Sequence, residues 1–301
     1  MKKHLYLKYT LRLIIIVLII GSGFWIINNY RYLLDIYAKK ISTKDSVAAI
    51  YSKHLELTDS GDLMLFGTYP EIKEKEDFNL KCDPPQNVIE LGCYKTVVNK
   101  IYVLNINEPN LKDIEVVTMA HELLHSAYER LSSKEKNKIK NLLEKELSLL
   151  KNDKELQSRL KNYENSQPGS KNNELHSIIA TEYKNLSKEL EDYYKKYFKN
   201  RIKIVNLNEK NKNYLLSKEQ EIQEQKQYIE NLQSELNLLE AKMDKLKALN
   251  NISQYNLLVP KQNSLVEKLR TEINEYNEKV TIYNDIINSI NSRSYSSFDN
   301  I

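Results

Sequence analysis

Two histidines and a glutamate form the stretch of this sequence that is best suited to metal chemistry. His121, Glu122 and His125 make the pattern H-E-x-x-H within a run of helical periodicity. Residues four apart share one face of an α-helix, so the two imidazoles can point at a single ion. Imidazole nitrogen suits Zn²⁺, which favours nitrogen, sulfur and oxygen ligands in tetrahedral geometry. Glu122, one residue round the helix, can reach a metal-bound water and act as its general base.

The setting of this short pattern favours the zinc hypothesis over an accidental match. The chain has five histidines in 301 residues, and two of them lie in the pattern. The apolar residues around it repeat at helical spacing and would hold the helix in a core. They are Val116, Ala120, Leu123, Leu124 and Ala127. The simpler alternative is an amphipathic helix with two histidines on its polar face.

A catalytic zinc site with two histidines needs a third protein ligand. The candidates lie downstream, at Glu174, Glu182 and His176, and an ordinary helix face with acids in solvent is the alternative for all three. The chain here resembles the gluzincin metallopeptidases, in which a glutamate on a later helix completes H-E-x-x-H. The resemblance rests on the strings at 121–127 and 173–177 and covers about residues 44–200. It implies that Glu174 binds zinc, with Glu182 as the rival ligand.

The same resemblance carries expectations about fold and mechanism. It implies an α+β, mainly α, zincin-like domain at 44–200, made of an active-site helix, a short sheet and a ligand helix. Members often carry an Asp, four residues after the glutamate, that orients a ligating histidine; Ile178 stands there, so that partner must come from elsewhere. An edge strand that pairs with an extended polypeptide substrate is also implied, and residues 96–106 fit it. The oxyanion would be stabilised by a Tyr or His; Tyr128 and His176 are candidates, and a purely structural role for Tyr128 is the alternative.

The elements around the site are expected from periodicity and capping signals. A helix at 44–57 opens after Ser42 or Thr43, and the apolar run at 63–69 predicts a strand that ends at Pro70. Ser132 and Glu135 form a capping box at the start of another helix. The remaining elements, in order, are a loop at 71–94, a strand at 96–106, the zinc-motif helix from 111 or 113 to 131, and helices at about 132–163, 172–183 and 188–199.

The N-terminus has the composition of a membrane anchor. A basic tail at 1–12 precedes residues 13–30, which contain no charge and are long enough to span a bilayer. We expect a single-pass protein of the cell membrane with a cytoplasmic tail, a stalk at 31–43 and an extracytoplasmic catalytic domain. A signal peptide cleaved near Gly21-Ser22-Gly23, or a buried core helix, would be consistent with the same run.

The two cysteines, Cys82 and Cys93, flank a turn-rich segment. Outside the membrane they could form a disulfide, and the alternative is two unrelated buried thiols. Their spacing does not match the C-x₂₋₄-C pattern of zinc ligands. The net charge is only +4, and the Lys and Arg residues are mostly interleaved with Glu along the expected helices, so no nucleic-acid partner is expected.

The C-terminal third repeats every seven residues. Two apolar series fill the a and d positions of heptads, with Gln225 interrupting the d series, and two further series follow Pro260. Residues 205–292 therefore predict an antiparallel coiled-coil hairpin with its turn at 250–260, followed by a tail at 293–301. An intermolecular coiled coil, and so a homo-oligomer, would satisfy the same pattern. The heptad series are Leu215, Ile222, Ile229, Leu236 and Met243; Leu232, Leu239 and Leu246; Val266, Ile273, Val280 and Ile287; and Leu269, Tyr276, Tyr283 and Ile290.

Together these features predict a membrane-anchored zinc metallopeptidase that hydrolyses polypeptides. One alternative is a non-catalytic, membrane-anchored interaction or scaffold protein whose working part is the coiled coil. A zinc hydrolase that acts on a non-peptide bond is a third hypothesis.

Overall fold

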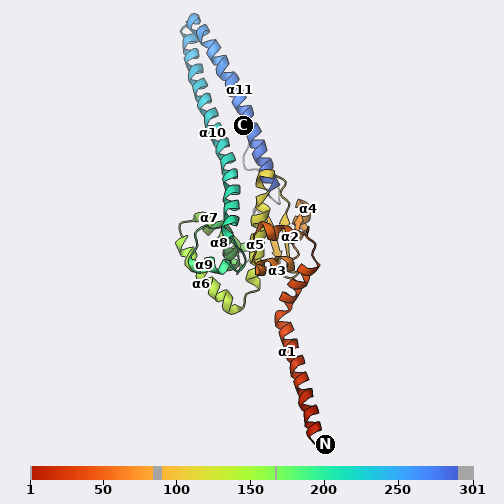
Figure 1. Cartoon of the computed structure of the whole chain (residues 1–301). Helices are drawn as coiled ribbons and strands as arrows, with labels where there is room; N and C mark the ends of the chain where they lie inside the picture. Colours follow the sequence, from red (N-terminus) through yellow and green to blue (C-terminus); the bar gives the residue numbers. More distant parts are fainter. Residues whose placement is uncertain (1, 84–89, 167, 291–301) are drawn as a thin grey trace. The chain divides into compact units, whose positions relative to one another are not determined.

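The computed structural model describes residues 2–83, 90–166 and 168–290 (Figure 1). The described chain is mostly helical with one small three-stranded sheet, which confirms the predicted α+β, mainly α, class. It divides into two compact units, which are described separately. Unit 1 contains residues 1–72, 92–103 and 118–205, and unit 2 contains residues 73–91, 104–117 and 206–301.

The helices and strands follow one another along the whole chain as follows. Before the zinc motif they are α1 (Lys2–Ile41), α2 (Val47–His54), α3 (Asp59–Gly67), β1 (Glu71–Lys73), α4 (Lys75–Cys82), β2 (Gly92–Lys95), β3 (Lys100–Leu104) and the short 3₁₀ helix η1 (Pro109–Leu111). From the motif onward they are α5 (Asp113–Glu129), α6 (Ser133–Leu149), α7 (Lys154–Ser166), α8 (Lys171–Glu182), α9 (Lys188–Tyr194), α10 (Arg201–Ala248) and α11 (Ile252–Ser289).

The sheet places β3 in the middle, with β1 and β2 on either side. β2 and β3 are antiparallel, with Gly92 opposite Val103 and Lys95 opposite Lys100. The predicted strand at 96–106 is therefore wrong in its bounds and position. Residues 96–99 form the turn of the hairpin, where Asn99 takes a positive φ of 50°, and the edge strands are β1 and β2. Asn tolerates the left-handed region better than most residues, which suits it to this turn.

The predicted strand at 63–69 is also wrong, because residues 63–67 belong to helix α3 and Thr68 is its C-cap. Thr58 caps the helix by accepting a hydrogen bond from the Gly61 backbone N–H. A short apolar run does not by itself distinguish a buried strand from a buried helix. Gly61 lies against the backbone of Tyr197, where an added Cβ would be 2.4 Å from the carbonyl oxygen. Close packing around α3 thus favours glycine there.

Two further expectations about the bounds of elements are corrected. The predicted loop at 71–94 contains β1, α4 and the start of β2, while its residues 84–89 lie outside the described part. The single helix expected at 132–163 is two helices, α6 and α7. The Ser132–Glu135 capping box is present at the start of α6. Asp153 ends the interruption, since its Oδ1 accepts from the Leu156 backbone N–H at 2.9 Å.

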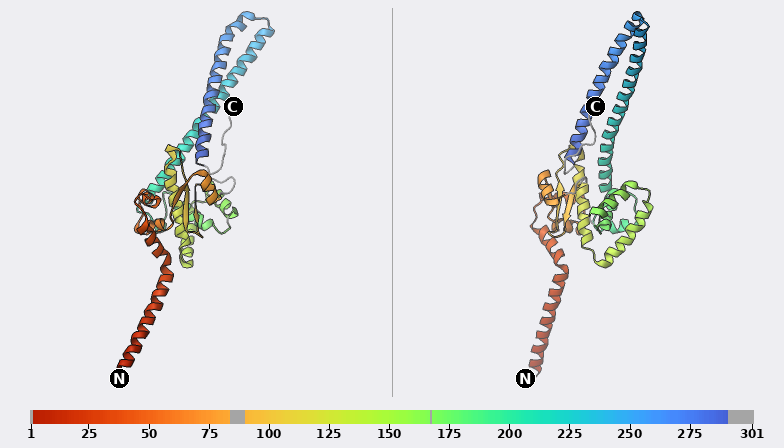
Figure 2. Two further views of the ribbon diagram at one scale, coloured as in Figure 1. Left: turned by 90° about the vertical axis from the view of Figure 1, so that its right-hand side faces the viewer. Right: turned by 180° about the vertical axis from the view of Figure 1, so that it is seen from behind.

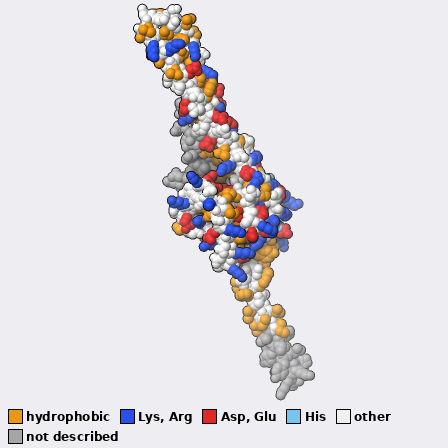
Figure 3. Space-filling model, turned by 90° about the vertical axis from the view of Figure 1, so that its left-hand side faces the viewer, with side chains coloured by type: hydrophobic (Ala, Val, Ile, Leu, Met, Phe, Trp, Pro, Cys, Tyr) orange, Lys and Arg blue, Asp and Glu red, His pale blue; other side chains and the backbone are white. Residues whose placement is uncertain are grey.

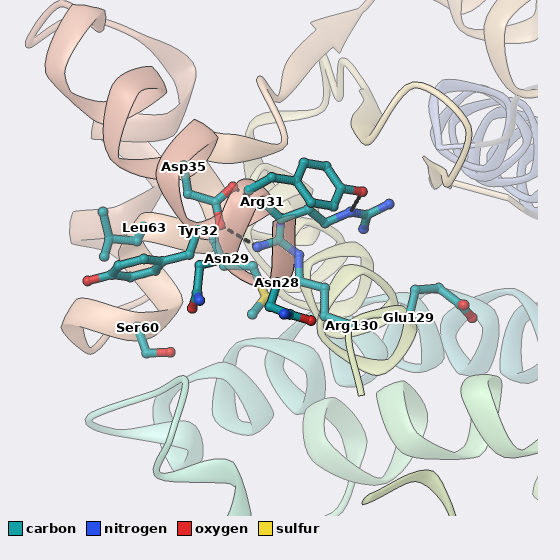
Figure 4. A pocket seen from close by; sticks show the side chains of 11 residues that line it. Asn28, Asn29, Arg31, Tyr32, Asp35, Ser60, Leu63, Glu129 and Arg130 are labelled. Carbon is teal, nitrogen blue, oxygen red and sulfur yellow. Dashed lines mark hydrogen bonds and ion pairs between the residues drawn. The ribbon is translucent and has the colours of Figure 1, made fainter. Parts of the chain in front are cut away.

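α1 is one continuous helix, and within the described chain it is the helix long and apolar enough to cross a membrane. The candidate span is Ile14–Ile41, with a mean hydropathy of 1.5. The predicted stalk at 31–43 is helical as far as Ile41 and packs against α3. Asp35, on the packed face, forms a buried ion pair with Arg130 at the end of α5. A cavity of about 540 Å³ lies beside this pair, and Figure 4 shows the two side chains meeting on its wall.

Unit 2 is dominated by α10 and α11, which lie side by side in both views of Figure 2. A short turn at 249–251 joins them, with Asn250 in the left-handed region at φ 54°. Pro260, expected in the turn, lies inside α11 instead. Most residues of the predicted seam are buried, but Val266 is exposed and Leu265 is buried in its place. Gln225 bridges the two helices, donating to Glu272 Oε2 at 2.6 Å and accepting from Lys279 at 2.8 Å. The predicted tail at 293–301 lies outside the described residues.

Candidate metal centre

Helices α5 and α8 of unit 1 bring two imidazoles and one carboxylate together. The ligand atoms of His121, His125 and Glu174 all lie within 4.8 Å of one another. His121 Nε2 is 3.7 Å from Glu174 Oε2, and His125 Nε2 is 3.6 Å from Glu174 Oε1. Both Nε2 atoms therefore face the same carboxylate. The group could hold a metal ion, and its members are the histidines of the sequence motif and the glutamate that the gluzincin resemblance indicated.

The surroundings of this group are largely removed from water. His125, Glu174 and Glu122 are buried, while the His121 side chain is 18% exposed. The opposite face of α5 is buried: Ala120, Leu123 and Leu124 of the predicted apolar stripe are fully buried, and so is Met119. Burying this stripe fixes the rotation of α5 and so aims its histidines at Glu174.

Glu174 carries a buried oxygen that lacks a hydrogen-bond partner in the described structure, namely Oε2. Burial raises the pKa of this carboxyl, but the charges of His125 and His121 outweigh burial and leave the pKa below its ordinary value. The group is therefore ionised at neutral pH. A buried, ionised oxygen without a hydrogen-bond donor calls for a cation. Two imidazole nitrogens and one such carboxylate are a donor set that fits Zn²⁺ with a coordination position left over.

The ligand helix α8 is held firmly at its C-terminal end. The Arg201 guanidinium is buried there and donates to the backbone carbonyls of Ala180, Tyr183 and Lys184 at 2.7–2.9 Å. These carbonyls lie at or just beyond the last turn, where helix carbonyls lack helical partners. Glu191 pairs with the same guanidinium at 2.7 Å. This cap stabilises the helix that positions Glu174.

A chain of hydrogen bonds holds the outer nitrogen of His125. Asn173 Nδ2 donates to Glu129 Oε1 at 3.1 Å, and Asn173 Oδ1 lies 3.0 Å from His125 Nδ1. Lys136 stabilises the Glu129 carboxylate from its other side at 3.2 Å. An ionised carboxylate can only accept, so Glu129 turns the amide nitrogen of Asn173 toward itself and the amide oxygen toward His125.

This orientation selects one tautomer of His125. The amide oxygen accepts from Nδ1–H, which leaves the Nε2 lone pair free on the side that faces Glu174. Asn173 thus supplies the partner that could not come from Ile178. Its position next to Glu174 in the sequence was the available signal, because a residue at the start of α8 also faces α5.

The other two candidate ligands lie outside the group. Both oxygens of Glu182 are bound by the Arg159 guanidinium, each at 2.7 Å. His176 is fully buried, and its Nε2 lies 3.0 Å from the Tyr193 hydroxyl. Burial and the nearby charges of His125 and His121 lower the pKa of His176 to about 3. The His176 ring also packs against the Tyr128 ring at a centroid distance of 5.5 Å, so these two residues belong to one aromatic cluster.

Comparison with protein-family models, with curated proteins and with solved structures finds no match to this chain.

Gly92 is a residue of the site that the sequence reasoning missed. It lies in the edge strand β2, and a Cβ added there would be 2.9 Å from Glu122 Oε1 and 2.5 Å from Thr118 Cγ2. Any other side chain would push the strand away from α5 or displace the Glu122 carboxylate. A lone glycine at the start of a strand signals close approach of another group, which was the signal available in the sequence.

The two cysteines are both buried, and neither is a free thiol. Cys82 is the last residue of α4 and Cys93 lies in β2. Neither belongs to the metal-binding group, in line with their spacing in the sequence.

Proposed function

We propose that this chain is a membrane-anchored zinc metallopeptidase with a zincin-like catalytic unit. The observation that carries the proposal is the convergence of His121, His125 and Glu174 on one point, with Glu122 on the same helix. When bound there, Zn²⁺ would supply Lewis acidity, lowering the pKa of a water toward about 7 and polarising the scissile carbonyl.

The residues of the chain have separate tasks in this reaction. His121, His125 and Glu174 would hold the ion, and Glu129 with Asn173 would keep His125 in the tautomer that exposes Nε2. Glu122 would take a proton from the attacking water and later give it to the leaving amine, which is general base and then general acid catalysis. Its burial places this proton transfer away from bulk water.

The edge strand β2 supports a polypeptide as the substrate. It is one of the two outer strands of the sheet, and Gly92 brings it against Glu122. An extended peptide could add to this edge by main-chain hydrogen bonds, which would set its carbonyls beside the general base. A small-molecule substrate would have no use for such an edge.

The remaining parts of the chain are assigned as follows. α1 would anchor the protein with its N-terminus in the cytoplasm and unit 1 outside, as the basic tail favours. α10 and α11 would form an intramolecular antiparallel coiled coil, since their buried residues face one another within one chain. A polar layer at Gln225 would fix the register of the two helices.

The test is metal content together with peptidase activity of the full chain in detergent. We expect one zinc per chain, loss of the metal in His121→Ala, and loss of casein cleavage with the metal retained in Glu122→Gln. Glu182→Gln is the matched control, because its carboxylate binds Arg159, and it should keep the metal. Cleavage that persists after chelation, or in Glu122→Gln, would overturn the mechanism.

Two outcomes of these experiments would favour a different function. A chain that binds no zinc and cleaves nothing would be a scaffold whose working part is the hairpin. A chain that binds one zinc but cleaves only esters or other non-peptide bonds in a substrate screen would be a different zinc hydrolase.

A further inference from the structure

The closed end of the α10–α11 hairpin exposes apolar side chains. Leu249, in the turn, and Leu257, in the first turns of α11, are 77% and 75% exposed, and Ile252 at the start of α11 is also exposed. Nearby seam residues behave differently, since Leu239 and Met243 are buried between the helices. The peptidase proposal gives this end no task, and packing within unit 2 does not cover it.

The same end carries a concentrated positive charge. Residues 242–261 contain four lysines, Lys242, Lys245, Lys247 and Lys261, and one acid, Asp244, which gives 4 − 1 = +3. The whole chain of 301 residues has a net charge of +4. Lys261 forms an ion pair with Glu235 at 2.9 Å, whereas the other three lysines have no ion-pair partner among the described residues. Figure 3 shows orange and blue side chains gathered at this end of the hairpin.

We propose that the hairpin tip, defined as residues 242–261, docks on an anionic lipid surface. Leucine and isoleucine side chains that project from a turn can enter the headgroup region of a bilayer, which requires no groove on the partner. Lysine stems can lie along the apolar surface while the ammonium groups reach lipid phosphates. A nucleic acid would match the charge and leave the leucines exposed, so the lipid surface accounts for both observations.

The tip suits this role because it lies at the end of a long pair of packed helices. Residues 206–248 of α10 extend about 65 Å at 1.5 Å per residue. The buried seam along this length keeps the two helices together, so the exposed residues stay at the end. Docking needs neither a metal nor catalysis, so this proposal does not depend on the peptidase proposal.

The test uses the full chain held by α1 in nanodiscs of phosphatidylcholine. Free vesicles of phosphatidylcholine, with or without phosphatidylserine, are added, and the nanodisc-bound chain that floats with the vesicles is measured. We expect flotation with the phosphatidylserine vesicles only. Replacing Lys242, Lys245 and Lys247 together by serine should weaken binding by about 100-fold, at about fivefold for each lysine.

The apolar contribution is tested with a matched pair of double variants. Leu249→Asp with Leu257→Asp should abolish flotation. Leu216→Asp with Ile282→Asp introduces the same charges at sites that are 49% and 50% exposed elsewhere on the hairpin, and should bind as the unchanged chain does. All four sites are exposed, so folding should persist, and circular dichroism checks this. Absence of flotation, equal flotation with neutral vesicles, or equal loss in both pairs would overturn the proposal.

Discussion

Replacing Asn173 by alanine tests the hydrogen-bond chain behind the metal-binding group. The change removes the 3.0 Å contact to His125 Nδ1, which keeps the longer 3.5 Å contact to the Ser177 hydroxyl, and touches no atom that faces the metal position. Leaving a buried polar group without its partner costs about 1–3 kcal/mol. That range corresponds to about 5- to 150-fold in affinity, and comparable outer partners of metal ligands are worth about 10- to 100-fold. We therefore expect zinc to bind Asn173→Ala about 10- to 100-fold more weakly.

The assay is competition for zinc against a chromophoric chelator, with the full chain in detergent. Asn173→Asp restores an acceptor for His125, but it sets a second carboxylate 3.1 Å from Glu129, so like-charge repulsion opposes it. Adding Glu129→Gln removes the repulsion, and the double variant should bind zinc better than either Asn173→Ala or Asn173→Asp. An affinity within twofold of the unchanged chain in Asn173→Ala would refute the argument that this amide selects the tautomer.

Three further predictions concern the edge strand, a helix cap and the cysteines. Gly92→Ala should keep the zinc and lower kcat at least tenfold, because the added methyl meets the carboxylate of the proposed base; unchanged kcat would contradict this contact. Ser132→Ala should lower the free energy of unfolding at neutral pH by about 1 kcal/mol, measured by denaturant titration. The Ser132 hydroxyl and backbone N–H lower the pKa of Glu135, so this stabilisation is present above the ordinary value of 4.5. The difference in free energy of unfolding between the unchanged chain and Ser132→Ala should become smaller as pH falls through the pKa of Glu135 in the folded protein. A difference that does not change with pH would show that the Glu135 carboxylate does not contribute to the cap. Thiol titration of the denatured, exported chain should find no free thiol until a reductant is added, and two afterwards; two thiols at the start would exclude a disulfide between Cys82 and Cys93.

Long, periodic segments were the part of the fold that the sequence predicted best. The apolar stripe of α5 and most of the α10–α11 seam follow from spacing alone, because one side of each helix must be buried. The strand prediction at 63–69 was wrong because a short apolar segment with almost no polar positions shows neither the helical nor the strand period. The prediction that Val266 belongs to the buried seam was wrong because Leu265 and Leu269, which are four residues apart, share the buried face instead. A shift of one residue in the buried face depends on the partner helix.

The sequence predicted the candidate metal-binding residues, but it did not predict the residues that hold them in place. His121 and His125 are fixed by a helical spacing, while Glu174 came from the likeness of one short string to a known family. The partners that hold the ligands are brought together only by tertiary packing. Glu129 lies 44 residues before the Asn173 that it orients, and Arg201 caps a helix that ended 19 residues earlier. No local pattern links residues at such separations.

α1 continues without a break from its apolar segment onto the packed surface of unit 1. The Asp35–Arg130 ion pair ties that junction to the end of α5. If the apolar segment lies in a bilayer, a tilt of the helix turns the whole unit with it. If the chain is the peptidase proposed above, such a continuous helix would limit how far its site can move from the anchor. In that case we expect cleavage only of polypeptides that come within a fixed distance of the lipid, so this distance would restrict the substrates more than their amino-acid sequence does.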